Sequence, residues 1–103
     1  MRGFVYRLIP PRPTFAFDMS DAEGETMQAH VEYWSKLAAD GKALAFGPVL
    51  DGEAGYGLGV VLAEDIDEAE ELRAEDPAIR SSHGFKVEIS PFLRLVTPDA
   101  TYG

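Results

Sequence analysis

The order of four short apolar segments and two helix-like stretches limits the folds open to this chain. Residues 3–9, 43–50, 58–63 and 85–96 are rich in apolar, β-branched and aromatic types, as strands are. Helices are predicted over 22–39 and 68–74, with a short helical turn near 78–81. The order β-α-β-β-α-β predicts an α+β, ferredoxin-like split βαβ fold, with two helices on one face of an antiparallel four-stranded sheet.

Local signals place the ends of these elements. Prolines 10, 11 and 13 end the first strand and begin a loop, residues 51–57 form a glycine-rich turn, and Pro91 bends the last strand or puts it at an edge. The expected caps are Ser20 or Asp21 for the first helix and Asp65 or Asp67 for the second, and the expected stops are Asp40-Gly41 and Asp76-Pro77. We expect a single domain over 1–96 and a frayed tail over 97–103.

The predicted sheet is too apolar for one of its faces to lie in water. Residues 43–50 and 58–63 contain almost no polar side chain, and 85–96 ends in an apolar run. An open face of this kind associates with another apolar surface. We therefore expect a homodimer formed through the sheet.

The net charge and hydropathy of the chain argue against two classes of partner, nucleic acids and membranes. There are 18 acidic and 9 basic residues, for a net charge of −9, and no basic cluster that could bind a phosphate backbone, so nucleic acid is not expected as a partner. Much of the acid lies in 64–75, which we interpret as the solvated face of a helix. No segment approaches the about 18 apolar residues of a membrane span, and no signal-peptide cleavage site follows the first apolar run, so we expect a cytoplasmic protein without membrane contact.

Three motifs suggest phosphate binding, a serine nucleophile and a metal site, but each lacks neighbouring residues that such a site needs. The glycines Gly55, Gly57 and Gly59 precede a strand instead of a helix, so they form no phosphate cradle and are interpreted as turn and strand-entry residues. Ser81-Ser82-His83 lacks the nucleophile-elbow pattern, although Ser82 could bond backbone or a ligand. A metal site would need His30, Asp76 and a third ligand, and the sequence has no cysteine and no paired histidines. We expect no metal and no cofactor.

The helix over 22–39 places one histidine on its apolar side. At 100° per residue one stripe contains Met27, His30, Val31, Trp34, Leu37 and Ala38. A buried imidazole needs a hydrogen-bond partner, and Asp76 at the end of the neighbouring helix is in a position to supply it. Such a carboxylate would fix the tautomer and leave the other ring nitrogen for a substrate proton. A core histidine with a purely structural partner is the alternative.

The residues H-V-E-Y-W-S-K-L-A-A-D-G-K-A-L-A-F-G-P-V (30–49), E-D-P (75–77) and S-P-F (90–92) together resemble the YCII-like, or YciI-related, family. The resemblance implies a ferredoxin-like fold, dimers of the dimeric α+β barrel type and a His-Asp pair. By position the pair is His30 with Asp76, with Asp40 as a rival. A related enzyme eliminates chloride from a chlorinated hydroquinone. The long Pro-rich loop and residues 97–103 depart from the family pattern.

Two functions are consistent with these observations. The first is a lyase or isomerase-type enzyme that uses His30 and Asp76 for proton transfer on a small, cyclic or aromatic substrate. Phe46, Gly47 and Pro48 would form the pocket wall, because Gly-Pro lets a ligand approach the backbone, and Tyr33 and Ser82 would also bind substrate. The alternative is a non-catalytic module that binds a metabolite or a protein.

Overall fold

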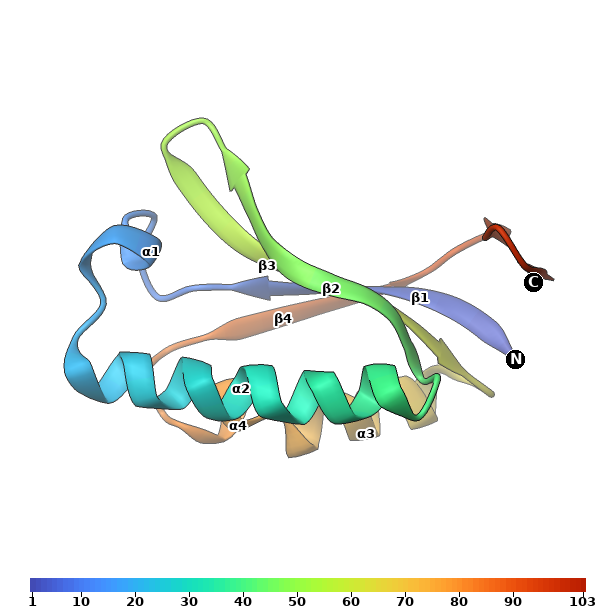
Figure 1. The fold of residues 1–103 in the computed structure, drawn as a ribbon, viewed down its shortest axis with the longest axis horizontal. Coiled ribbons are helices and arrows are strands. Elements are labelled where there is room, and N and C mark those ends of the chain that lie inside the picture. Colours follow the sequence, from blue (N-terminus) through green and yellow to red (C-terminus); the bar gives the residue numbers. More distant parts are fainter.

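A computed structural model describes residues 1–103 and contains the predicted elements in the predicted order (Figure 1). The four main strands are β1 (Arg2–Ile9), β2 (Ala43–Asp51), β3 (Ala54–Ala63) and β4 (Lys86–Pro91). The helices are α1 (Phe15–Asp18), α2 (Asp21–Ala39), α3 (Ile66–Glu75) and α4 (Pro77–Arg80). Two short strands follow, β5 (Leu95–Val96) and β6 (Thr101–Tyr102).

The main sheet has the strand order β2-β3-β1-β4, with every neighbouring pair antiparallel. Helices α2, α3 and α4 all lie on one face of this sheet, and the opposite face carries no helix (Figure 1). This confirms the predicted α+β, ferredoxin-like architecture. None of the helices is both long and apolar enough to cross a membrane.

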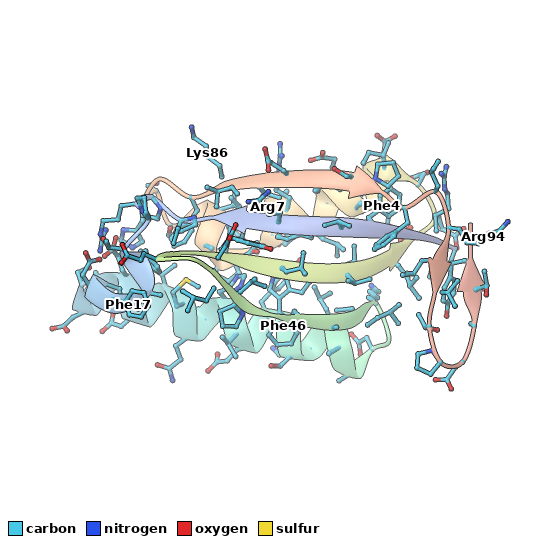
Figure 2. The ribbon with its side chains drawn as sticks, turned by 90° about the horizontal axis from the view of Figure 1, so that it is seen from above. Phe4, Arg7, Phe17, Phe46, Lys86 and Arg94 are labelled. Atoms are coloured by element: carbon cyan, nitrogen blue, oxygen red, sulfur yellow. The ribbon has the colours of Figure 1, made fainter.

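The core lies between the sheet and the helices. On β1 the buried side chains Phe4, Tyr6 and Leu8 alternate with Val5 and Arg7, which belong to the opposite face. Figure 2 shows that face, with Arg7 in its middle. The exposed positions of β4 on this face are polar: Lys86, Glu88 and Ser90. The open face is therefore less apolar than the sequence suggested, with its apolar residues concentrated over β2, β3 and part of β1.

Helix α2 begins and ends where its capping residues require. The backbone N–H of Glu23 donates to Ser20 Oγ (3.1 Å), and the N–H of Ser20 donates to Glu23 Oε1 (2.8 Å), which is a capping box. The helix stops at Asp40, and Gly41 adopts a left-handed φ of 77°, a conformation glycine reaches without strain. Both ends match the predicted signals.

The N-terminal loop and the hairpin differ from the prediction. Residues 15–18 form the helical turn α1 instead of loop, because Phe15 is buried against Phe85 with ring centroids 5.1 Å apart. The predicted turn over 51–57 is only the pair Gly52-Glu53, with Gly52 at φ 64° as the first residue of a two-residue turn. Strand β3 therefore begins at Ala54, four residues earlier than expected.

The C-terminal strand prediction was wrong beyond Pro91. The strand expected over 85–96 ends there, since proline cannot donate to a ladder. Residues 95–96 instead pair with 101–102 in a small hairpin, so the segment expected to be a frayed tail is ordered. Leu95 packs so closely on Gly3 that a Cβ at Gly3 would lie 2.5 Å from its Cδ2. This contact fixes the hairpin at the end of the sheet opposite α1 (Figure 2).

Candidate functional site

Asp76 occupies the corner between α3 and α4, and the local sequence explains why. Proline at position 77 disfavours a helical conformation for the preceding residue, and Asp76 is extended, with φ −66° and ψ 121°. Its side chain then caps α4, because the backbone N–H of Ala78 donates to Asp76 Oδ1 (2.9 Å). The corner faces α2, and Asp76 is completely buried.

Three side chains converge on this buried carboxylate. His30 of α2 contacts Asp76 Oδ1 through Nδ1 at 2.8 Å. Trp34, one turn further along α2, donates from Nε1 to Oδ2 at 3.0 Å, and the Tyr6 hydroxyl of β1 donates to the same oxygen at 2.8 Å. With the Ala78 N–H, four donors from β1, α2 and α4 surround one carboxylate, two on each oxygen.

The protonation state of the carboxylate follows from these donors. Burial alone would raise the pKa of Asp76, but the hydrogen bond and electrostatic attraction of His30, with the hydrogen bonds from Trp34 and the Ala78 N–H, outweigh it and hold the pKa below its usual range. Asp76 is therefore ionised and can only accept, so His30 must donate from Nδ1. Burial, together with the adjacent Asp76 charge, raises the pKa of Tyr6, which keeps its proton.

The second ring nitrogen of His30 is accessible, and the residue lines a cavity. Every fully buried side-chain nitrogen or oxygen has a hydrogen-bond partner, yet Nε2 of His30 has none, so this atom is the accessible one. His30 lines a cavity of about 500 Å³ between α2, the β2–β3 hairpin and α1. This volume is within the range of small-molecule sites. The geometry leaves one imidazole nitrogen open to a ligand and fixes the other.

The position of the Trp34 ring beside the cavity depends on Gly59, which the sequence suggested as a turn or strand-entry residue but which lies within β3. A Cβ on Gly59 would lie 2.6 Å from the Trp34 ring, so only glycine lets this ring lie against β3. Trp34 also contacts the rings of Tyr6 and Phe46, with centroids 4.7 and 5.9 Å away. The glycine at this position thus allows the indole N–H to reach Asp76.

Helix α1 forms one wall of the cavity and is held by Arg12. The guanidinium donates to the Asp18 side chain and backbone carbonyl and to both carboxylate oxygens of Glu23, at 2.8–2.9 Å. The Arg12 hydrogen bond is the largest cause that lowers the pKa of Glu23 to about 2. Phe17 of α1 lines the cavity with most of its surface exposed. Figure 2 places it at the same end of the molecule as the tip of the β2–β3 hairpin.

The structure brings together some of the predicted site residues and separates others. Phe46, Gly47 and Pro48 line the cavity beside His30. Tyr33 does not: its hydroxyl donates to the Leu72 carbonyl (2.8 Å), and burial, followed by the charges of Asp76 and Glu75, raises its pKa to about 12.

Other sequence candidates lie away from the cavity. Ser82 is exposed after α4 with a left-handed φ of 65°, and it does not line the cavity. Asp40, the rival partner, is exposed at the C-terminal end of α2. His83 Nε2 pairs with Thr26 Oγ1 (3.1 Å), and no three His, Asp or Glu side chains are clustered as metal ligands.

Two members of the Asp76 network were missed as donors by sequence reasoning. Trp34 stands four residues after His30 and so shares its face, and a buried indole N–H needs an acceptor. Tyr6 alternates with core residues on β1, and a buried phenol has the same need. These requirements point to Asp76, the carboxylate that the sequence predicts as the partner of His30.

The family model for the YCII-related domain matches residues 4–93. The match therefore covers β1 through β4 and includes both His30 and Asp76. None of the curated proteins compared with the chain matches it.

Proposed function

The chain belongs to the YCII-related family, and from this premise we propose that it is a small-molecule enzyme in which His30 transfers a proton and Asp76 holds the imidazole. The observation that supports this proposal is the arrangement of one ring: Nδ1 is fixed on a buried carboxylate 2.8 Å away, and Nε2 stays accessible in a residue that lines a cavity of about 500 Å³. A positioned imidazole of this kind is a general acid and base.

The proposed step is a proton abstraction. Nε2 takes a proton from an acidic C–H or O–H of the substrate, and the electron pair of that bond stays on the substrate. His30 becomes an imidazolium that is stabilised by the Asp76 carboxylate, and Asp76 itself stays ionised. The proton then returns to another substrate atom in an isomerisation, or the electron pair expels a leaving group in an elimination. Both outcomes balance without a redox partner.

The cavity offers little for other reaction types. No Ser, Thr, Cys or Lys side chain lines it, so no nucleophile of those kinds is available for a covalent intermediate. Of the polar side chains on its surface, Tyr6 and Trp34 already donate to Asp76. His30 and Tyr56 remain. A substrate anion must therefore spread its charge over its own conjugated system, which favours cyclic unsaturated or aromatic substrates.

Ligand binding without chemistry is the second candidate function. The observation that favours it is the full set of four donors on Asp76, because such a network also stabilises the fold where β1, α2 and α4 meet. In this case Nε2 would only form a hydrogen bond to a ligand. The two functions share one cavity and differ in whether a proton is transferred.

Deuterium exchange distinguishes the two functions. Cyclic ketones such as cyclohexanone and 2-tetralone are incubated with the protein in D₂O, and loss of the α-proton signals is followed by NMR. The proposed enzyme accelerates exchange above the buffer rate. His30→Gln, whose amide can still donate to Asp76, loses the acceleration while keeping its fold. If the wild type binds these ketones without accelerating exchange, the enzyme proposal fails and the binding function remains.

The proposal includes a homodimer formed through the open sheet face. Val5 and Val60 are register partners on this face and are only partly buried in the single chain. A second copy would cover them. Sedimentation velocity at low micromolar concentration should give a dimer, and Val60→Lys should shift it toward monomer. A compact monomer in the wild type contradicts this part of the proposal.

A further inference from the structure

The cavity beside His30 is almost free of charge. Of its 21 lining residues 15 are hydrophobic, and none is Lys, Arg, Asp or Glu. Sites for carboxylates and phosphates in proteins provide Arg or Lys side chains or free backbone N–H groups at a helix start. At the start of helix α2 the N–H of Glu23 is taken by Ser20 in the capping box, and the first turn carries the acidic residues Asp21 and Glu23.

Both arginines near the cavity are engaged elsewhere. Arg12 is paired with Asp18 and Glu23, so its single positive charge meets two negative ones. Arg7 stacks on the ring of Tyr56, with its guanidinium carbon 4.4 Å from the ring centroid, and its side chain belongs to the open sheet face. Neither arginine lines the cavity. An incoming anion would therefore meet no free cation there.

His30, one of the two polar side chains that remain on the cavity surface, also disfavours anions. Nε2 of His30 presents a lone pair when the imidazole is neutral, and the ionised Asp76 lies directly behind the ring. An anion placed at Nε2 would lose its hydration in an apolar cavity and face a fixed negative charge. A neutral hydroxyl or an acidic C–H meets neither penalty, because it can donate to the lone pair.

We infer that this cavity selects electrically neutral, largely apolar ligands with one proton-donating group beside His30, and that it excludes carboxylates and phosphate esters. The inference rests on the proposed function in taking this cavity as the ligand site. It also fits the proposed proton transfer: abstraction from a neutral ligand produces an anion next to an imidazolium, whereas an anionic ligand would become doubly charged beside Asp76. Substrates are then expected to arrive without a phosphate or carboxylate group.

A matched pair of probes tests this selectivity. 4-tert-Butylbenzyl alcohol and 4-tert-butylbenzoate have the same ring and differ in charge at pH 7.5. Trp34 is the only tryptophan of the chain and lines the cavity, so its indole N–H gives a single NMR signal that reports occupancy. We expect the alcohol to bind at least tenfold more tightly than the benzoate.

Two variants provide the control for charge. Val31 lines the mouth of the cavity and is half exposed, so it can be replaced without disturbing the core. Val31→Lys should improve benzoate binding at least fivefold over Val31→Gln, while alcohol binding is similar in both. Equal affinity of the wild type for both probes would overturn the inference, and so would failure of both probes to shift the Trp34 signal. The enzyme proposal is judged separately, by deuterium exchange into neutral ketones, and survives if the benzoate binds.

Discussion

Asp76→Asn is a severe perturbation of the site. Asparagine has the shape of aspartate, but its amide nitrogen donates hydrogen bonds where a carboxylate oxygen accepts two of them. Each carboxylate oxygen accepts two hydrogen bonds, from Tyr6 and Trp34 on Oδ2 and from His30 and the Ala78 N–H on Oδ1. The asparagine amide nitrogen must replace one of these oxygens, and it can only donate. In either orientation it therefore faces a pair of donors.

One buried donor is left without an acceptor in both orientations. The Tyr6 hydroxyl can turn and accept, and His30 can change tautomer and accept, but the indole N–H of Trp34 and the Ala78 N–H cannot. An unsatisfied buried donor costs about 1–3 kcal/mol, and the remaining bonds lose their charge assistance. We expect Asp76→Asn to lower the free energy of unfolding by about 2–4 kcal/mol, since the carboxylate is completely buried.

Urea unfolding, followed by far-UV circular dichroism and by Trp34 fluorescence, measures this loss. Asp40→Asn is the matched control, because Asp40 is exposed and its loss should change the free energy by less than about 0.5 kcal/mol. The ¹⁵N shifts of His30 report which orientation the new amide adopts, since only one of them forces a change of tautomer. Equal stability of Asp76→Asn and the wild type would refute the hydrogen-bond reasoning.

Three further predictions follow from the same contacts. The pKa of Asp76 is lowered on folding, so its contribution to stability is present above the ordinary carboxyl pKa of about 4 and is lost as the pH falls below it; acid titration of the wild type should show this loss and Asp76→Asn should not. Gly59→Ala would place a Cβ 2.6 Å from the Trp34 ring, and urea unfolding should show a loss of about 1–3 kcal/mol together with a shifted indole N–H signal. Arg12→Ala removes the hydrogen bonds that hold α1 and should speed amide exchange at Phe17, with little change in global stability because the ion pairs are partly exposed.

Controls for these variants come from the same chain. Gly47→Ala places a Cβ in open space on the neighbouring strand, so it should leave the Trp34 signal unchanged. Arg80→Ala breaks only the exposed pair with Glu75 and should not affect amide exchange in α1. If Gly47→Ala and Gly59→Ala shift the Trp34 signal equally, the close approach of the ring to β3 does not explain the role of Gly59.

The order of the elements was predictable because each is encoded by a local pattern. The alternation of Phe4, Tyr6 and Leu8 specifies a half-buried strand, and Ser20 with Glu23 specifies a helix start. Helix α1 and the C-terminal hairpin were not predictable in this way. Their stability comes from contacts with distant residues, Phe85 in one case and Gly3 in the other. Local propensity does not encode such contacts.

In the candidate site, too, some features follow from local sequence patterns and others depend on contacts between distant residues. The helical period puts His30 on the inner side of α2 and the Asp-Pro step puts Asp76 at the facing corner, so the sequence predicts the contact between them. Periodicity was less accurate for Val31, which was expected on the apolar stripe and is half exposed at the cavity mouth. Tyr33 and Ser82 were expected to bind substrate but do not line the cavity, because its position depends on the contacts of α1 and the hairpin, which local patterns do not encode.

The carboxylate of Asp76 joins residues as far apart in the sequence as Tyr6 and Ala78, so the site forms only when β1, α2 and α4 have packed. Stability and chemistry are therefore coupled at Asp76, and any variant there changes both. At His30 the two can be changed independently. Nδ1 takes part in the hydrogen-bond network of Asp76, whereas Nε2 is free for a ligand in the cavity that His30 lines. A His30 variant that keeps a donor toward Asp76 removes only the group that meets a ligand. For this reason His30→Gln, and not an Asp76 variant, is the decisive test of catalysis.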